Sequence, residues 1–234
     1  VSFFGVMFAL FAVRADELHV QEKKKTDGTL KEALAYLKKR PDLQLVMLTI
    51  FFASNFGLNM QIFNALMATK VFDKGAASYG MLGTLVGLGT LTGALIAARK
   101  DRTKRTKFVP LAAINFGFWI TVLALTPTFT WYAFVLPISG ISAITTMISA
   151  NTFVQANSDV AIRGRIMGIY MFIFMGGTPI GSPLIGFFSE HIGVRWTMAG
   201  CGVITLSAAI FALLKYRNKA VIPADVSVAS VLAS

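Results

Sequence analysis

Neutral amides are the first polar groups in this sequence that could bind a ligand. Asn55 and Asn59 lie in an apolar stretch and are spaced i, i+4, so on an α-helix they share one face. A carboxamide both donates and accepts hydrogen bonds, and it is costly in lipid unless those bonds are made. The pair is therefore expected to face protein or water. There it either contacts a bound substrate or bonds a neighbouring helix.

Hydroxyl groups with helical spacing form a second polar set further along the chain. Ser142, Thr146 and Ser149 lie along one side of another apolar stretch. Hydroxyls can bond back to carbonyls of their own helix, so each one alone is weak evidence of a binding site. Together with Asn55 and Asn59, they are the candidate substrate-binding residues.

Acid–base and metal chemistry have no candidate residues inside the apolar stretches. All 11 Asp and Glu lie in loops, flanks or the tail, whereas a proton relay usually uses a carboxylate or histidine within the bundle. Cys201 is the only cysteine, and His19 and His191 are far apart, so we predict no metal site. The sequence also lacks a Walker-type phosphate loop, an HExxH motif and a nucleophile elbow. We predict no enzyme activity and no cofactor.

The elements that must position the polar groups are membrane-spanning helices. Of the 234 residues, 55% are hydrophobic and 14% are charged, whereas soluble domains carry about 25% charged residues. A helix needs about 20 apolar residues to cross a bilayer. Six stretches meet this requirement: 43–68, 78–98, 108–126, 130–152, 165–188 and 196–215. The predicted fold class is an all-α membrane protein built as a six-helix bundle.

Basic residues alternate between the loops and predict the orientation. Of the 22 Lys and Arg, 19 fall in alternate loops and the tail, and short loops rich in these residues stay on the cytoplasmic side. The sequence therefore predicts a multi-pass protein of the plasma or inner membrane with a cytoplasmic C-terminus. The net charge of +11 lies in loops without interleaved aromatic residues, so we expect no nucleic-acid partner.

The segment before the first full span contains two further features. Residues 1–13 are apolar but cover only about 20 Å as a helix, so we interpret them as the end of a truncated membrane helix. Within the loop 14–42, Thr29 and Glu32 have capping-box spacing, and an apolar stripe follows them. This pattern predicts an amphipathic helix over 29–40 on the inner leaflet, or alternatively a solvated linker helix.

Glycines four residues apart mark the faces expected to pack against other helices. Small residues at this spacing let membrane helices approach closely. The pairs are Gly83 with Gly87, Gly89 with Gly93, and Gly177 with Gly181.

The second and fifth stretches are related by a shift of 88 residues. The shift places four residues on identical ones: Gly80, Gly89, Thr90 and Gly93 on Gly168, Gly177, Thr178 and Gly181. These stretches cross the membrane in opposite directions. The halves 43–126 and 130–215 are therefore predicted to form an inverted repeat of three helices each, as in many secondary transporters.

Two loop regions resemble a known transporter family. Asp101-Arg102-Thr103-Lys104-Arg105 resembles the D-R-x-G-R loop of major facilitator superfamily transporters, with Lys104 in place of the glycine. The second region is similar to helices 10–11 of the enterobactin-exporter-like facilitators, also called transmembrane secretion effectors. Its segments are Asn151-Thr-Phe-Val-Gln155, Arg163-Gly-Arg165-Ile-Met-Gly168 and Gly176-Gly-Thr-Pro179-Ile-Gly181.

The resemblance implies the C-terminal half of a twelve-helix transporter. Residues 1–13 would end helix 6, 14–42 would be the central loop, 43–215 would form helices 7–12, and 216–234 would be a cytoplasmic tail. Helices 7 and 10 would line the central cavity, and helices 8 and 11 would face the other half. Five residues would form gate contacts between the halves: Asp101, Arg102, Arg105, Arg163 and Arg165.

The function implied by this resemblance is secondary active transport. Relatives export siderophores, macrolides and other amphiphiles, usually by proton antiport. The expected partners are a small amphiphilic substrate, the bilayer and an N-terminal six-helix half that would carry the coupling residue. The alternative is a receptor or scaffold with the same fold that transports nothing. The membrane domain of an ATP-driven exporter fits poorly, because the loops here are short.

Overall fold

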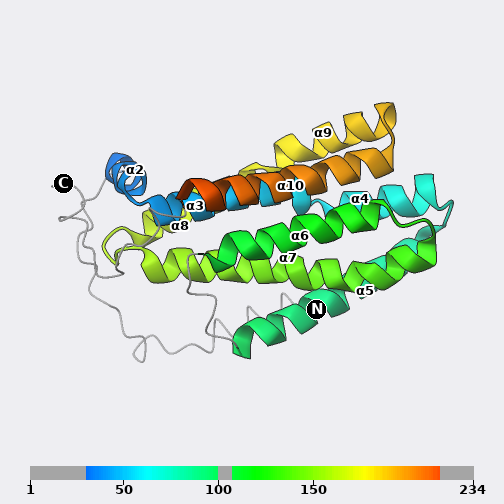
Figure 1. Cartoon of the computed structure of the whole chain (residues 1–234), viewed down its shortest axis with the longest axis horizontal. Coiled ribbons are helices and arrows are strands. Elements are labelled where there is room, and N and C mark those ends of the chain that lie inside the picture. Colours follow the sequence, from blue (N-terminus) through cyan, green and yellow to red (C-terminus); the bar gives the residue numbers. More distant parts are fainter. Residues whose placement is uncertain (1–29, 100–106, 217–234) are drawn as a thin grey trace, which may run out of the picture.

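The computed structural model describes residues 30–99 and 107–216, which form helices joined by short connections and contain no strand. Features predicted for residues 1–13, for Thr29, for the loop residues Asp101, Arg102 and Arg105, and for the tail after residue 216 lie outside these ranges. The long helices run side by side along the long axis of the molecule (Figure 1).

Each apolar stretch predicted from the sequence is largely helical. Within residues 30–99 and 107–216, five helical segments are long and apolar enough to cross a membrane, and Phe108–Ala124 is apolar but shorter, with 17 residues. In chain order the helices are α2 (Leu30–Lys39), α3 (Pro41–Phe52), the π-helix η2 (Ala53–Gly57), α4 (Met60–Leu66), the π-helix η3 (Met67–Val71), α5 (Ala76–Arg99), α6 (Phe108–Ala124), α7 (Phe129–Asn157), α8 (Arg163–Gly176), α9 (Thr178–His191) and α10 (Val194–Tyr216).

The first span is interrupted where the sequence predicted a continuous helix. The α-helical turns of α3 give way to the wider turns of η2, and the chain leaves helical geometry at Leu58 before α4 begins. Gly57 lies against the next span but one, since a Cβ there would be 2.6 Å from the Phe116 ring. A π-helical turn of this kind inserts an extra residue into the helix and is frequent at functional sites.

The helical hydrogen bonding of the fifth span is also interrupted, at Gly177, although the backbone dihedral angles of Gly177 remain α-helical. Helix α8 ends at Gly176, and α9 begins at Thr178 with a proline in its first turn. Pro179 suits that position because its missing N–H would have no partner within the helix. The interruption lies just before Pro179, and a second proline, Pro183, lies inside α9.

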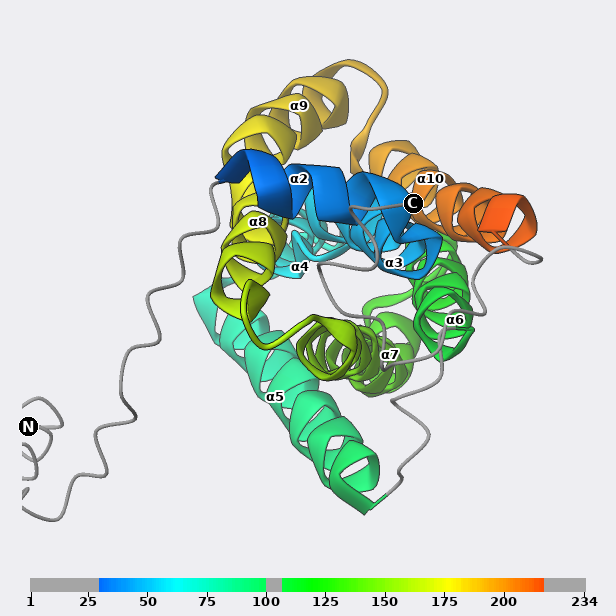
Figure 2. The same ribbon diagram turned by 90° about the vertical axis from the view of Figure 1, so that its left-hand side faces the viewer.

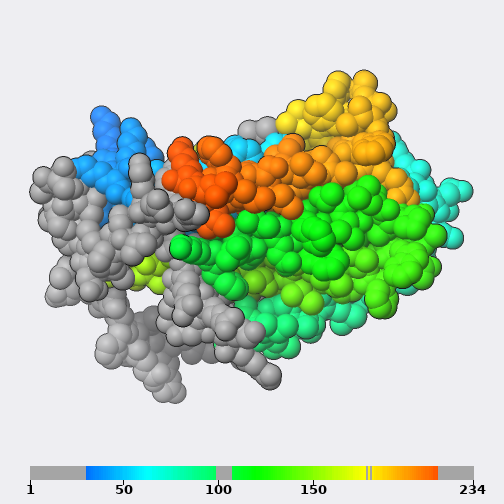
Figure 3. Space-filling model, viewed as in Figure 1, coloured from blue at the N-terminus to red at the C-terminus, as the bar shows by residue number. Residues whose placement is uncertain are grey.

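Close backbone contacts join the long helices in pairs. A Cβ at Gly89 of α5 would lie 2.2 Å from the carbonyl oxygen of Pro137 in α7. A Cβ at Gly117 of α6 would lie 2.8 Å from the carbonyl oxygen of Gly202 in α10. Figure 3 shows α6 and α10 side by side across one face of the molecule. These glycines let the helix axes approach within packing distance of each other.

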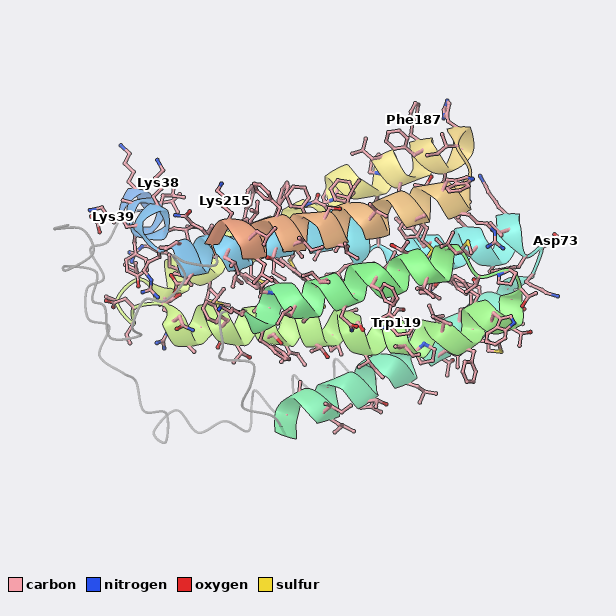
Figure 4. All side chains as sticks on the ribbon, in the orientation of Figure 1. Lys38, Lys39, Asp73, Trp119, Phe187 and Lys215 are labelled. Carbon is pink, nitrogen blue, oxygen red and sulfur yellow. The ribbon has the colours of Figure 1, made fainter. Side chains whose placement is uncertain are left out.

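Exposed charged residues lie at both ends of the bundle, and the first described helix marks one of them. Figure 4 places Lys38, Lys39 and Lys215 at one end and Asp73 at the other. Helix α2 lies across the lysine end, at a steep angle to the long helices, when the bundle is viewed along its axis (Figure 2). Its buried residues Ala33 and Tyr36 join a core cluster with residues of α3, α7 and α8.

Candidate functional site

The amide pair lies at the interruption of the first span. Asn55 and Asn59 are 4% and 6% exposed. The Nδ2 of Asn55 donates to the carbonyl of Phe51 at 2.7 Å, and the Nδ2 of Asn59 donates to the carbonyl of Asn55 at 2.7 Å. Both side chains therefore satisfy backbone groups of their own span, beside the point where its regular helix is broken.

The fifth span packs onto this amide pair at its own interruption. A Cβ at Gly177 would lie 2.4–2.6 Å from the side-chain atoms of Asn55, and one at Gly181 would lie 2.4 Å from the Asn55 carbonyl oxygen. Ser182 of α9 donates from Oγ to Oδ1 of Asn59 at 3.3 Å. The two interrupted spans thus touch at their breaks. For either amide to contact a substrate, α9 must move away from η2.

The candidate hydroxyls point into their own helix. The Oγ1 of Thr146 donates to the carbonyl of Ser142 at 2.8 Å, and the Oγ of Ser149 donates to the carbonyl of Thr145 at 2.5 Å. Ser142 bonds back to Ile138 in the same way. Its oxygen also accepts from Nδ2 of Asn115 in α6 at 2.7 Å. No hydrogen bond joins the hydroxyl set to the amide pair within the described ranges.

The two glycine pairs of α5 have different surroundings. Gly89 and Gly93 are buried against α7, where a Cβ at Gly93 would lie 2.5 Å from the side chain of Ile144. Gly83 and Gly87 are exposed, and a Cβ at either would have no neighbour within 4 Å. Within the described part of the chain, Gly89 and Gly93 therefore form the pair of α5 that packs against another helix.

Two of the predicted gate residues lie at the start of α8. Arg163 donates from Nη2 to the carbonyl of Ser158 at 3.3 Å, and its Nε has no hydrogen-bond partner among the described residues. Arg165 is half-buried and makes interactions within the structure. The other three gate candidates, Asp101, Arg102 and Arg105, lie outside the described ranges.

A buried ion pair at the start of the first span was not predicted. Arg40 and Asp42 are 1% and 2% exposed, and two hydrogen bonds of 2.9 and 2.7 Å join the guanidinium to both carboxylate oxygens. Arg40 also donates to the hydroxyl of Tyr36 at 2.6 Å and to the carbonyl of Asn157 at 3.1 Å. These four residues, the Arg40 cluster, join α2, α3 and the end of α7.

The electrostatics of the cluster favour a charged arginine. Burial by itself lowers the pKa of Arg40, but the hydrogen bonds and negative charge of Asp42 outweigh it, so the pKa is raised. The sequence analysis counted Arg40 only as a loop cation. The available signal was Asp42, an acidic residue directly before an apolar span and two residues after an arginine.

A second unpredicted group ties the opposite end of the bundle together. Arg195 of α10 donates from Nη1 to the carbonyl of Ala124 at 3.1 Å and also to the carbonyl of Thr126. Its guanidinium lies 5.3 Å from the ring centre of Phe72. A cation at the last carbonyls of a helix is favourable, so Arg195 caps α6 as well as adding positive charge to its loop.

An apolar cavity of about 210 Å³ lies between α9 and α10. Phe56 of η2, Trp196 and Cys201 contribute to its wall, together with aliphatic residues of both helices. None of the five candidate substrate-binding residues lines it. The cavity is therefore separate from the polar groups on which the sequence analysis relied.

Tyr132 and Asn64 connect the fourth span to the first. The hydroxyl of Tyr132 donates to Oδ1 of Asn64 at 2.7 Å, and both side chains are buried. We expect Tyr132→Phe to lower the free energy of unfolding by about 0.6 kcal/mol, and by about 1.7 at most, as for other hydrogen bonds between membrane helices. Unfolding in mixed detergent micelles would measure this.

The control for that experiment is the double variant Tyr132→Phe with Asn64→Leu, which removes both partners. Removing both polar groups should cost less than leaving the Asn64 amide oxygen buried without a donor. Equal stability of Tyr132→Phe and the wild type would contradict a contribution from this bond.

Comparison with known protein families places the chain in one of them. A family model described as transmembrane secretion effector matches residues 1–230. The comparison with curated proteins and the comparison with solved structures found no match.

Proposed function

The chain belongs to the transmembrane secretion effector family of major facilitator transporters, and from this premise we propose that it exports amphiphilic small molecules by alternating access. The family suggests a transporter rather than an enzyme, and the apolar helices make the chain a multi-pass membrane protein. Siderophore-like and drug-like compounds are the substrate class we propose. The substrate binds near the middle of the bilayer, between this six-helix half and a preceding one.

The observation that carries this proposal is the contact between two interrupted spans. Secondary transporters typically place their substrate sites where membrane helices are broken, near the bilayer midplane. Here the break of the first span, with Asn55 and Asn59, lies against Gly177 and Gly181 at the break of the fifth. Each of these spans can bend where its helical hydrogen bonding is interrupted. The two spans can therefore change their relative tilt while the regular helix on either side of each interruption keeps its packing.

The packing of the helices supports the proposed inverted repeat. In such a repeat, a contact between the second and fourth spans has its counterpart between the fifth and first. Gly89 packs on Pro137 in the first of these contacts, and Gly177 packs on Asn55 in the second. The 88-residue shift carries Gly89 onto Gly177. On this basis we assign 43–126 and 130–215 as the two repeats of a C-terminal half.

The proposed cycle assigns gate roles to the basic residues at the α2 end of the bundle. Following the distribution of Lys and Arg, we place this end in the cytoplasm. The side chain of Arg163 is only partly buried, and a carboxylate on the opposite half would pair with its guanidinium when the gate is closed. Arg165 and the loop residues Asp101, Arg102 and Arg105 complete the proposed gate.

Proton antiport is the proposed source of energy. Among the described residues, Asp42 is the one buried carboxylate, and it is held by Arg40. Asp42 lies in the first turn of the first span, and the described residues in the middle of the spans include no carboxylate. We therefore assign the titrating group to the preceding half.

Transport measurements on the full-length protein test the proposal. In proteoliposomes with a proton gradient, the wild type should export an amphiphilic dye or siderophore, and failure with every such compound would contradict it. Asn55→Ala and Asn59→Ala should each raise the KM about tenfold, the size of one lost polar contact. The matched control is Gln61→Ala, which removes an exposed amide of α4 and should leave the KM unchanged.

Two further outcomes of the same measurement are informative. Unchanged KM values for Asn55→Ala and Asn59→Ala in a folded protein would remove these amides from the substrate site. Substrate binding without movement across the membrane would indicate a receptor or scaffold with this fold.

A further inference from the structure

Helix α2 is held rigidly across one end of the bundle. Its axis lies across the long helices in both views (Figures 1 and 2). Ala33 and Tyr36 are fully buried against the bundle, and Arg40 follows directly after the helix. Through the Arg40 cluster, the helix is bonded to Asp42 of α3 and to the carbonyl of Asn157 at the end of α7. Its position relative to the spans is therefore fixed.

The opposite face of α2 combines exposed leucines with exposed lysines. Leu30 and Leu34 are 61% and 43% exposed, and Lys31 and Lys38 are also exposed. Leu30, Leu34 and Lys38 follow each other at four-residue spacing, so they lie along one side of the helix. Lys31 lies beside this row. An apolar edge next to a basic edge is typical of helices that lie in a membrane interface.

The level of α2 along the bundle places this face at the membrane surface. The first candidate span begins at Pro41, two residues after the last residue of α2. The chain therefore passes directly from α2 into the apolar region. Lys215, near the end of the last span, lies at the same end of the bundle (Figure 4). Headgroups of the adjacent leaflet are the nearest charged surface at this level.

We propose that the exposed face of α2 binds the anionic headgroups of phospholipids in the adjacent leaflet. Leu30 and Leu34 would rest at the boundary with the acyl chains, while Lys31 and Lys38 would extend to the phosphates. The charges are complementary, because the exposed side chains are cationic and the headgroups carry negative charge. The inference depends on the membrane location of the protein and is independent of its substrate and of the direction of transport.

Quenching of a probe on α2 by brominated lipids tests the inference. The probe is a fluorophore on Ala35→Cys, in the full-length protein with its native cysteines replaced, reconstituted in phosphatidylcholine vesicles. Brominated phosphatidylglycerol should quench the probe at a lower mole fraction than brominated phosphatidylcholine. Lys31→Gln with Lys38→Gln should raise the half-quenching mole fraction of phosphatidylglycerol, by up to about fivefold for each lysine removed.

The chain offers a control with the same change in charge. Lys70 and Lys74 are exposed near Asp73, at the other end of the bundle (Figure 4), and Lys70→Gln with Lys74→Gln should leave the quenching curve unchanged. Equal quenching by the two lipids would overturn the proposal. So would equal shifts in the two double variants, since that would reflect total charge. Because the assay needs no substrate, its failure is distinguishable from failure to transport.

Discussion

Gly89→Ala is expected to lower the free energy of unfolding by about 1–3 kcal/mol or more, as overpacking of a closely packed contact does. A Cβ at this position would lie 2.2 Å from the carbonyl oxygen of Pro137 and 2.8 Å from its Cα. Both atoms belong to the backbone, so rotation of a side chain cannot relieve the clash, and α5 must separate from α7. Unfolding of the full-length protein in mixed micelles would measure the loss.

The neighbouring glycines of α5 provide a graded set of controls. Gly87→Ala should be neutral or slightly stabilising, since a Cβ there meets nothing within 4 Å and alanine restricts the unfolded chain. Gly93→Ala should fall in between, because the atom nearest to its Cβ is a side-chain methyl of Ile144. Equal stability of the Gly87 and Gly89 variants would contradict the α5–α7 packing described above.

Arg40→Ala is expected to be the most damaging change at the α2 end. Breaking a buried ion pair by removing one partner costs about 3–5 kcal/mol, because the remaining charge is left buried and uncompensated. Asp42 would be that charge, and Tyr36 and the carbonyl of Asn157 would lose their donor. Unfolding measurements, together with faster proteolysis within α2, would show the effect.

The matched control replaces both charges. Arg40→Met with Asp42→Leu keeps the volume of the pair and leaves no isolated charge, so its cost should be much smaller than that of Arg40→Ala. If the double variant is as unstable as the single one, the ion pair does not determine stability here. The hydrogen bonds to Tyr36 and Asn157 would then be the important contacts.

The helical segments of the fold could be predicted because the bilayer imposes them. Backbone N–H and C=O groups in lipid must form hydrogen bonds within their own segment, so each long apolar stretch was predicted to be a helix. The structure has helices in all six stretches. The interruption at Gly57 and Leu58 could not be predicted. At that point Gly57 packs against the Phe116 ring of another span, and no local pattern encodes that contact.

The same limit applies to the candidate site. Four-residue spacing correctly indicated that Asn55 and Asn59 lie close together, since the Nδ2 of Asn59 bonds the carbonyl of Asn55. It did not show that Gly177 and Gly181 cover them. The sequence analysis used Arg40 and Arg195 only as cations that predict the orientation of the chain. A count of cations does not show which carboxylate or carbonyl oxygens each arginine binds. The substrate-binding and gate roles stay predictions.

The short helix α6 makes the free energy of the protein in the membrane depend on the thickness of the bilayer. Its 17 residues extend about 26 Å, whereas a typical hydrocarbon core is about 30 Å thick. Because α6 is held between α7 and α10, it cannot tilt or lengthen independently to remove this hydrophobic mismatch. We expect the lipids beside Leu111 and Phe118, its exposed apolar residues, to compress instead, at fractions of a kcal/mol for each ångström. We therefore expect the bilayer to be locally thinner on this side of the protein.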